Sequence, residues 1–259
     1  MTEPIFRRDG DAFLPTAHAV GPWDPSQLHG GAPGALIAHA LDAPGFQVAR
    51  ITFDFLGPVT TDPLTIAVDT VKPGRRAQLA EAELSAGGRV VLRARALRLR
   101  REAVDLADAA QDAQPPPGLP ADARPSPFPG AQQGTPGFHL TGMDIRFMAG
   151  SDYGRGPARA WFRMARPLVD DEPPSPLARV LAAADFGNGV SRIVDFDRFL
   201  FVNADLTVHV HREPAGEWVL LDARTRLEGE TGAGLASSVL SDERGPLGLA
   251  AQSLFVAAR

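Results

Sequence analysis

Apolar and polar positions divide the chain into two similar stretches, each a helix pattern followed by four strand patterns. In the first stretch, the small and apolar residues of 32–41 fall at helical spacing, and Pro33 fits a first helical turn. Turns rich in Gly and Pro then separate four runs that have the composition of strands. These predicted strands are residues 46–56, 64–71, 77–84 and 89–99.

The second stretch repeats this order. Ser175 and Pro176 open a helical run that continues to Ala184 and ends at the turn-like residues 185–189. The predicted strands that follow are residues 198–211, 218–227, 234–240 and 247–256. Three shorter runs are expected to form additional strands before the helices, namely residues 12–20, 138–147 and 158–164.

A nearly constant offset relates the two stretches. Ile51 lies opposite Leu206 at a shift of 155 residues, and Gly88 lies opposite Gly245 at a shift of 157. A repeated order of elements at such an offset indicates an internal duplication. Each unit is then expected to be one apolar helix wrapped by one antiparallel sheet, which is an α+β arrangement.

A proline-rich segment separates the two units. Eight prolines lie between Pro115 and Pro136, and proline is excluded from the middle of helices and of central strands. The sequence therefore predicts an N-terminal unit at 1–102, a linker at 103–136 and a C-terminal unit at 137–259. The linker is expected to be partly extended and to pack across a surface.

Composition narrows the range of functions. The 259 residues include no cysteine, which excludes a disulfide scaffold, a thiolate nucleophile and a cysteine-bound metal. The formal net charge of −5 gives no basic field for nucleic acid. The N-terminus has no signal-like apolar region, and nothing approaches 18 consecutive apolar residues. We therefore expect a cytoplasmic protein that does not insert into membranes.

Several short motifs, in this order and spacing, resemble the medium- and long-chain acyl-CoA thioesterases. They are HGG at 29–31, RITFDFLGP at 50–58, ADFGN at 184–188, FVNADLTVHVHR at 201–212 and AQS at 251–253. The resemblance covers nearly the whole chain apart from the linker. It implies a double hot-dog fold, a homo-oligomer and hydrolysis of the thioester of a fatty acyl-CoA, with no cofactor.

The resemblance also implies three catalytic positions. They are an Asp after the second helix, here Asp185, a Ser or Thr on the following strand, and a Gln near the C-terminus, here Gln252. Asn203 occupies the hydroxyl position, which is a departure from the family, although an amide can also orient water or bind a carbonyl. Thr207 is the nearby hydroxyl if the alignment is shifted.

Hydrolysis of a thioester by water requires a base for the water proton and donors for the developing oxyanion. Asp185 could be the base, with Gln252 and Asn203 holding the water or the carbonyl. The residues at the start of the first helix, Gly30 and Gly31, offer backbone N–H groups, and we expect the Gly31 amide to bind the thioester carbonyl. The neighbouring His29 is a candidate for substrate contact.

Structural explanations compete with each of these roles. Asp185 could cap a turn, and Gln252 could satisfy backbone groups inside an apolar strand. No third ligand joins His209 and His211, so no metal site is expected. Arg95 lies opposite Gln252 in the repeat alignment, so one active site, furnished mainly by the second half, is expected. The arginines of 89–101 fit a solvated strand or a CoA phosphate contact.

Two alternative functions remain open at this point. The Asn203 departure favours an acyl-CoA or lipid-binding hot-dog protein that does not catalyse. A hot-dog enoyl-CoA hydratase or dehydratase is the other alternative, because one fold supports several chemistries.

Overall fold

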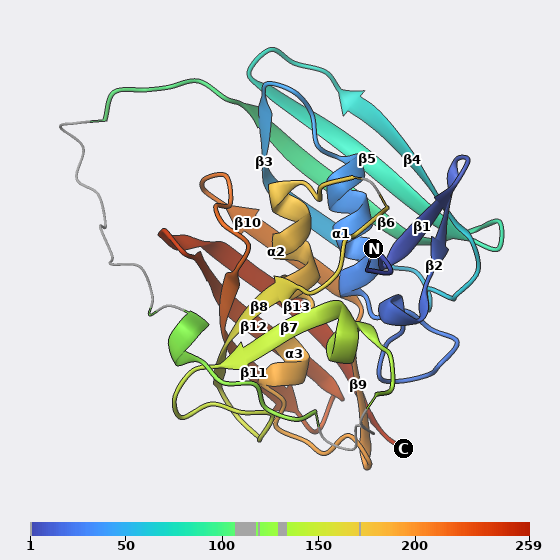
Figure 1. Cartoon of the computed structure of the whole chain (residues 1–259), viewed down its shortest axis with the longest axis vertical. Helices are drawn as coiled ribbons and strands as arrows, with labels where there is room; N and C mark the ends of the chain where they lie inside the picture. Colours follow the sequence, from blue (N-terminus) through green and yellow to red (C-terminus); the bar gives the residue numbers. More distant parts are fainter. Residues whose placement is uncertain (1, 107–117, 119, 129–133, 171) are drawn as a thin grey trace.

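The computed structural model describes residues 2–106, 118, 120–128, 134–170 and 172–259 (Figure 1). Much of the predicted linker therefore lies outside the described residues. The N-terminal unit contains one long helix and six strands. Its elements are β1 (Phe6–Asp9), β2 (Ala12–Pro15), η1 (Ala17–Ala19), α1 (Gly31–Ala40), β3 (Phe46–Phe55), β4 (Leu64–Lys72), β5 (Ala77–Ala86) and β6 (Arg89–Arg100).

The remaining elements follow the same order of helix and strands. They are η2 (Pro120–Asp122), η3 (Phe138–Gly142), β7 (Met143–Phe147), β8 (Ala158–Met164), α2 (Pro176–Ala184), α3 (Gly187–Val190), β9 (Phe199–Asn203), β10 (Asp205–Val210), β11 (Val219–Glu228), β12 (Ala233–Asp242) and β13 (Gly245–Ala258). The predicted order of helices and principal strands agrees with these elements.

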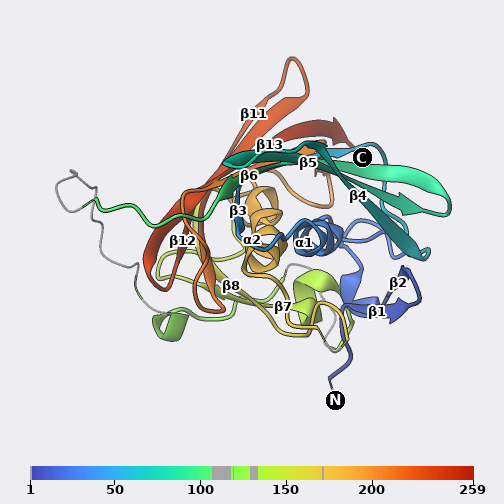
Figure 2. The ribbon, with the colours of Figure 1, turned by 90° about the horizontal axis from the view of Figure 1, so that it is seen from above.

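One curved sheet surrounds the two long helices. The described strands are joined in the order β1-β2-β4-β5-β6-β3-β10-β13-β12-β11-β8-β7, and β9 pairs with β13. Figures 1 and 2 show α1 and α2 side by side in the hollow of this sheet. Both helices are almost entirely buried, as expected for helices enclosed on all sides. The architecture is the double hot-dog fold predicted above.

The two units join where β3 pairs with β10. Thr52 lies opposite Thr207 in this antiparallel pair, and their hydroxyl groups hydrogen bond at 3.1 Å. Ile51 pairs with Val208, and Phe53 pairs with Leu206. Because the repeat offset of 155 equates Thr52 with Thr207, an approximate twofold axis passes between these two residues. The duplication inferred from the sequence is therefore visible as symmetry.

Two of the additional strands are shorter than predicted. The run at 12–20 forms a strand only to Pro15, after which the Thr16 side chain accepts a hydrogen bond from the His18 amide and caps a 3₁₀ turn. The run at 138–147 begins as the π-helical turn η3 and becomes a strand at Met143. In both places, a threonine side chain bonds to nearby backbone groups and stabilises a turn where the pattern suggested a continuous strand: Thr16 at η1, and Thr141 with Gly137 at η3.

The predicted strand at 198–211 is divided by a bulge at Ala204. Asn203 pairs with Leu254, whereas Thr207 pairs with Ala251, so the register shifts by one residue between them. Such an insertion reverses the faces to which later side chains point. Asn203 consequently faces the inside of the sheet and Thr207 the outside.

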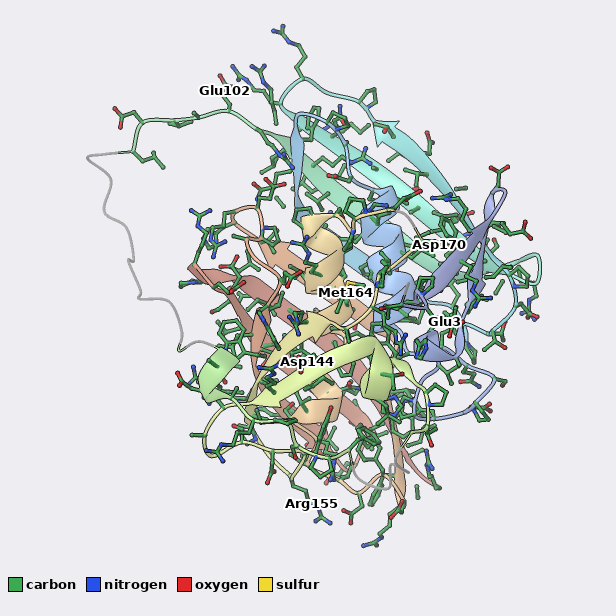
Figure 3. All side chains as sticks on the ribbon, in the orientation of Figure 1. Glu3, Glu102, Asp144, Arg155, Met164 and Asp170 are labelled. Carbon is green, nitrogen blue, oxygen red and sulfur yellow. The ribbon has the colours of Figure 1, made fainter. Side chains whose placement is uncertain are left out.

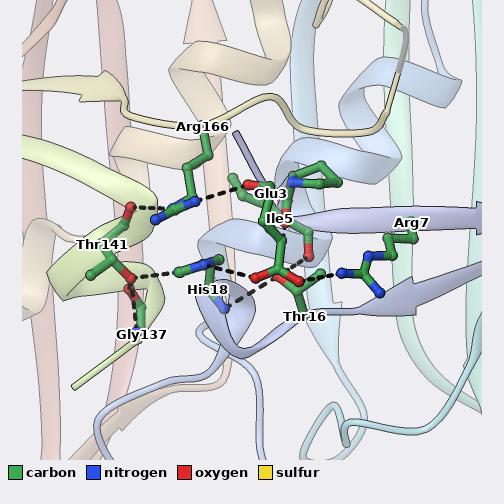
Figure 4. A network of polar contacts seen from close by, with 9 residues as sticks. Glu3, Ile5, Arg7, Thr16, His18, Gly137, Thr141 and Arg166 are labelled. Carbon is green, nitrogen blue, oxygen red and sulfur yellow. Dashed lines mark hydrogen bonds and ion pairs between the residues drawn. The ribbon is translucent and has the colours of Figure 1, made fainter. Parts of the chain in front are cut away.

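A network of hydrogen bonds and ion pairs connects residues near the N-terminus to η3 (Figure 4). His18 Nδ1 lies 2.7 Å from Thr141 Oγ1, and His18 Nε2 lies 3.3 Å from a Glu3 carboxylate oxygen. Arg166 donates to the backbone carbonyls of both Glu3 and Thr141. Burial, followed by the charge of Arg166, lowers the pKa of His18 below its ordinary value. The network fixes the position of η3, which carries His139.

Pieces of the predicted linker pack against the C-terminal unit. Gly118 accepts a hydrogen bond from the Trp161 indole, Ala123 is buried in the same cluster, and Arg124 forms a two-bond bridge with Phe147. Charged side chains such as Glu102 and Arg155 lie on the outside of the molecule (Figure 3). No helix in the described ranges is long and apolar enough to cross a membrane.

Candidate active site

A cavity of about 590 Å³ opens between the two units, beside the ends of both long helices. Both halves and the linker contribute to its wall. The lining residues used below are His29, Gly30, Phe128, His139, Tyr153, Asp185, Phe186, Asn188, Phe196 and Asn203. The site is thus a joint product of the duplicated units and not of the second half alone.

Asp185 is the residue at the C-terminal end of α2 and is 5% exposed. One carboxylate oxygen, Oδ1, accepts a hydrogen bond of 2.9 Å from Asn203 Nδ2 and a longer one of 3.4 Å from Gln252 Nε2. The other oxygen, Oδ2, lies 3.1 Å from His29 Nδ1. Side chains from β9, from β13 and from the segment before α1 therefore hold this carboxylate in one orientation.

Gln252 connects β13 to the turn after α2. Its side-chain oxygen accepts from the Asn188 amide at 3.1 Å, and its nitrogen reaches both the backbone carbonyl and the side chain of Asp185. This fixes which amide atom faces the carboxylate, since an ionised carboxylate only accepts hydrogen bonds. Gln252 therefore satisfies buried backbone groups in this turn and, in addition, contacts the Asp185 carboxylate.

Asn203 reaches Asp185 because of the bulge at Ala204. Its amide nitrogen also donates to the Asp205 carbonyl at 3.2 Å, and the residue lines the cavity. Asn203, which stands where the family has a hydroxyl residue, therefore still makes a polar contact to the Asp185 carboxylate.

His29 has two competing partners at the same ring nitrogen. The Gly31 amide lies 3.1 Å from Nδ1 with the geometry of a donor, and Asp185 Oδ2 is also 3.1 Å away. Nδ1 can accept from the amide only without a proton, whereas it can donate to the carboxylate only with one. The ring is stacked on Phe186 at 4.2 Å between centroids, and this contact supports its position beside both partners.

Close packing leaves little room for a Cβ at Gly30, Gly31 and Gly187 around the carboxylate. A Cβ on Gly30 would lie 2.9 Å from Asp185 Oδ2 and 3.0 Å from the Phe55 ring. A Cβ on Gly187 would lie 2.9 Å from Gln252 Oε1. Gly31 faces the Ala182 carbonyl, and its amide donates to His29, so the expected oxyanion role of Gly31 is not supported by this arrangement. Gly30, which lines the cavity, is better placed.

Other residues named from the sequence lie away from the cavity. Thr207 is on the outer face of the sheet, bonded to Thr52, and His209 is exposed beside it. Within the described ranges, no three acidic or histidine side chains gather as a metal site would require. Arg95 pairs with Glu81 on the outer face, so it is not the counterpart of Gln252.

The strand pairing identifies the true counterparts in the first unit. Arg95 pairs with Thr52 as Ala251 pairs with Thr207, which makes Ala96 the equivalent of Gln252. A register shift between Val48 and Arg50 repeats the bulge at Ala204. The first unit therefore has Val48 where the second has Asn203. The residue at the end of α1, equivalent to Asp185, is Leu41.

Sequence reasoning missed much of the cavity wall, including three residues from irregular segments. Phe128 belongs to the proline-rich segment, His139 to η3, and Tyr153 to the loop between β7 and β8. Phe128 and Tyr153 lie outside every predicted element, and His139 lies in a run that was predicted as a strand. The one available signal was that Tyr153 is the single tyrosine of the chain.

Comparison with known proteins identifies the family of this chain. Residues 19–99 match the family model of the acyl-CoA thioesterase N-terminal domain, and residues 120–256 match that of the C-terminal domain. The chain belongs to the acyl-CoA thioesterase family. It is accordingly a thioester hydrolase.

Solved structures are similar to this thioesterase over nearly its whole length. A proposed thioesterase of Novosphingobium aromaticivorans is 25% identical over 98% of this chain and 99% of that chain, with a TM-score of 0.74. A hot-dog protein of Alicyclobacillus acidocaldarius is 20% identical over 98% and 95%, with a TM-score of 0.68. An acyl-CoA thioesterase II of Mycobacterium marinum is 21% identical over 89% and 88%, with a TM-score of 0.60. A search of curated proteins finds no match.

Gln252→Ala is expected to lower both the stability and the turnover of the thioesterase. Gln252 is 2% exposed, so its loss leaves the Asn188 amide buried without its acceptor, at a cost of about 1–3 kcal/mol. Asp185 also loses one of its three contacts. Urea unfolding and thiol-release kinetics measure the two effects separately. An unchanged unfolding free energy would show that Gln252 does not support this turn.

Acidification below about pH 6.5 is expected to destabilise the thioesterase through His139. Burial, with a smaller contribution from the charge of His29, lowers the pKa of His139 to about 3. Below an ordinary pKa of about 6.5 the unfolded chain binds a proton that the folded chain does not, so stability falls by up to ~1.4 kcal/mol per pH unit.

The variant His139→Phe measures this effect, since phenylalanine binds no proton in either state. Its unfolding free energy is expected to decrease less than that of wild type between pH 7 and pH 5, by about 2 kcal/mol. Parallel curves for the two proteins over this interval would contradict the buried, neutral state of His139.

Proposed function

We propose that this thioesterase hydrolyses acyl-CoA with a water molecule that Asp185 activates. The supporting observation is the buried carboxylate, which contacts Asn203, Gln252 and His29 and opens onto the cavity. A fixed carboxylate beside an apolar cavity can accept a proton from water without first having to reorganise.

The proposed reaction begins with water bound between Asp185 and the side-chain oxygen of Asn203. As the water oxygen attacks the thioester carbonyl, Asp185 takes its proton, and the carbonyl electrons move to the oxygen. When these electrons form the C=O bond again, the C–S bond breaks. The CoA thiolate leaves and receives the proton from Asp185. The products are a carboxylic acid and CoA, and no covalent intermediate with the protein is formed.

Stabilisation of the oxyanion is assigned to the start of α1. Gly30 lines the cavity at the N-terminal end of this ten-residue helix, where the helix dipole is positive. His29 is assigned a positioning role, because its Nδ1 can hold Asp185 Oδ2 when protonated and the Gly31 amide when not. In this proposal Gly30 contacts the oxyanion, and His29 positions Asp185. Gly31 acts only through its amide contact with His29, because Gly30 and His29 line the cavity and Gly31 does not.

The decisive experiment is thiol release from a panel of acyl-CoAs with graded acyl groups, including a 2-enoyl-CoA. Thiol release from at least one member is the expected result and ranks the acyl groups. Binding without release would favour the binding-protein alternative, and hydration of the enoyl group without release would favour the hydratase.

A homo-oligomer and a cytoplasmic location remain part of the proposal. The outer face of the C-terminal sheet exposes large apolar side chains, which are common at subunit contacts. They are Leu235, Val239, Leu249 and Phe255. Light scattering at micromolar concentration tests the assembly, and a purely monomeric protein would refute it.

A further inference from the structure

Two loops supply part of the cavity wall. One runs from residue 148 to 157, between β7 and β8, and the other from residue 191 to 198, between α3 and β9. The first loop contributes Tyr153 to the lining of the cavity, and the second contributes Phe196. Loops lack the regular hydrogen bonds of helices and sheets, so other contacts must hold these two lining residues in place.

Arg192 joins the two loops. Its Nη2 donates to the Tyr153 carbonyl at 2.9 Å, and its Nη1 donates to the Val194 carbonyl at 3.0 Å. The guanidinium carbon lies 5.0 Å from the centre of the Phe196 ring, in a cation–π contact. The backbone carbonyl of Arg192 also accepts from the Gly156 amide at 2.8 Å. Arg192 therefore contacts the residue that each loop contributes to the cavity.

The side chain of Arg192 is a buried cation without a close carboxylate. It is 9% exposed, and its nearest ion-pair partner, Asp195, has Oδ1 at 3.9 Å from Nη1, which is too long for a hydrogen bond. Nε has no hydrogen-bond partner in the described ranges. Burial lowers the pKa of Arg192, but a guanidinium still carries its charge at physiological pH. Burying such a charge is unfavourable, so stability alone does not account for its position.

A second contact between the same loops lies at the surface. Arg155 Nε donates to Asp195 Oδ1 at 3.1 Å, and the Arg155 side chain is exposed on the outside of the molecule (Figure 3). Exposed ion pairs contribute little to stability, because water competes for both charges. Neither residue lines the cavity. The buried contacts of Arg192 are therefore the ones suited to fix the two lining residues.

The contacts of Arg192 are separate from those of the reacting groups. The Asp185 carboxylate is oriented by Asn203, Gln252 and His29. Within the described ranges, Arg192 forms no hydrogen bond or ion pair with any of these four residues, and it does not line the cavity. A displacement of the two loops would therefore change the shape of the cavity and leave the carboxylate in its orientation.

We infer that Arg192 is a positioning residue for substrate binding, which holds Tyr153 and Phe196 in the arrangement that accepts acyl-CoA. It acts through these two lining residues and contacts neither the substrate nor Asp185. This inference rests on the proposed hydrolysis of acyl-CoA and adds a residue to the same site. Its consequence is that loss of the Arg192 contacts weakens binding and leaves the chemical step unchanged.

The test measures thiol-release kinetics and the binding of CoA thioethers, which cannot be hydrolysed and match the acyl groups of the panel. Arg192→Met keeps an unbranched side chain but removes the charge and every donor. It is expected to raise KM and the thioether Kd about tenfold, with kcat within about twofold of wild type. Arg192→Lys keeps the charge and a donor for one carbonyl, so it is expected to recover part of the loss.

Arg98→Met is the matched control. Arg98 is buried as well, and it donates twice to a backbone carbonyl, that of Leu41, at 3.0 and 2.7 Å. Neither Arg98 nor Leu41 lines the cavity. This variant is expected to lower Tm, as Arg192→Met does, and to keep the wild-type KM and thioether Kd.

The two constants separate the possible outcomes. Unchanged KM and thioether binding in a folded Arg192→Met protein would show that Arg192 only stabilises the fold, and would overturn the inference. An equal loss of binding in Arg98→Met, or a lower kcat without weaker binding in Arg192→Met, would overturn it too. If Arg192→Met does not fold, Arg192→Lys is judged by the same constants. Absence of thiol release from every acyl-CoA overturns the proposed function, whereas weaker thioether binding in the variant would still support the role of Arg192 in the site.

Discussion

Asp185→Asn is expected to lower kcat for thiol release by about 10²–10⁴-fold, the usual contribution of a general base. The amide has nearly the shape of the carboxylate but cannot accept the proton of water. KM is expected to change little, because the carboxylate contacts Asn203, Gln252 and His29 and is not needed to hold the acyl group. Steady-state kinetics on the best acyl-CoA of the panel measure both constants.

Folding of this variant must be verified independently. The Asn side chain can keep an oxygen toward Asn203 Nδ2 and present its NH₂ to His29 Nδ1, so the thermal midpoint is expected to stay within a few degrees of wild type. A well-folded Asp185→Asn protein with undiminished kcat would remove Asp185 as the base.

Gly30→Ala is expected to reduce kcat/KM by about 100-fold, because a misplacement of about 1 Å at a reacting group has effects of this size. The added methyl group would lie 2.9 Å from Asp185 Oδ2 and 3.0 Å from Phe55 Cζ. One of these groups has to move, and Phe55 ends β3 within the sheet. The carboxylate and the water it holds are then displaced.

The matched control is Gly34→Ala in the same helix. No atom outside the helix lies within 4 Å of a Cβ at Gly34, and alanine is favoured over glycine inside helices by up to ~1 kcal/mol. We expect Gly34→Ala to raise the thermal midpoint and to retain full turnover. Full activity of Gly30→Ala would mean that the carboxylate tolerates displacement and that close packing at Gly30 has no catalytic meaning.

The sequence predicted the parts of the fold that depend on local periodicity. The helices, the principal strands and the duplication followed from apolar spacing and from turns rich in Gly and Pro. Asp185, Asn203 and Gln252 were expected together only through the family resemblance, and they do lie together. Nothing in the local pattern around any one of them indicates this proximity.

The missed features depend on single residues and on long-range packing. A bulge of one residue at Ala204 decides whether Asn203 or Thr207 faces the cavity, and strand periodicity does not indicate where a bulge occurs. Phe128, His139 and Tyr153 come from irregular segments that only the tertiary fold brings to the cavity. The prediction for Gly31 did not include the neighbouring His29, whose Nδ1 accepts from the Gly31 amide.

The repeated bulge bears on how the two halves have diverged. Leu41, Val48 and Ala96 are all buried and apolar, whereas Asp185, Asn203 and Gln252 keep polar groups in the same framework. Arg98 donates to the Leu41 carbonyl at the end of α1, as Gln252 does to that of Asp185 at the end of α2. At these three positions the first half needs only packing, so Leu41, Val48 and Ala96 should accept apolar exchanges that Asp185, Asn203 and Gln252 do not.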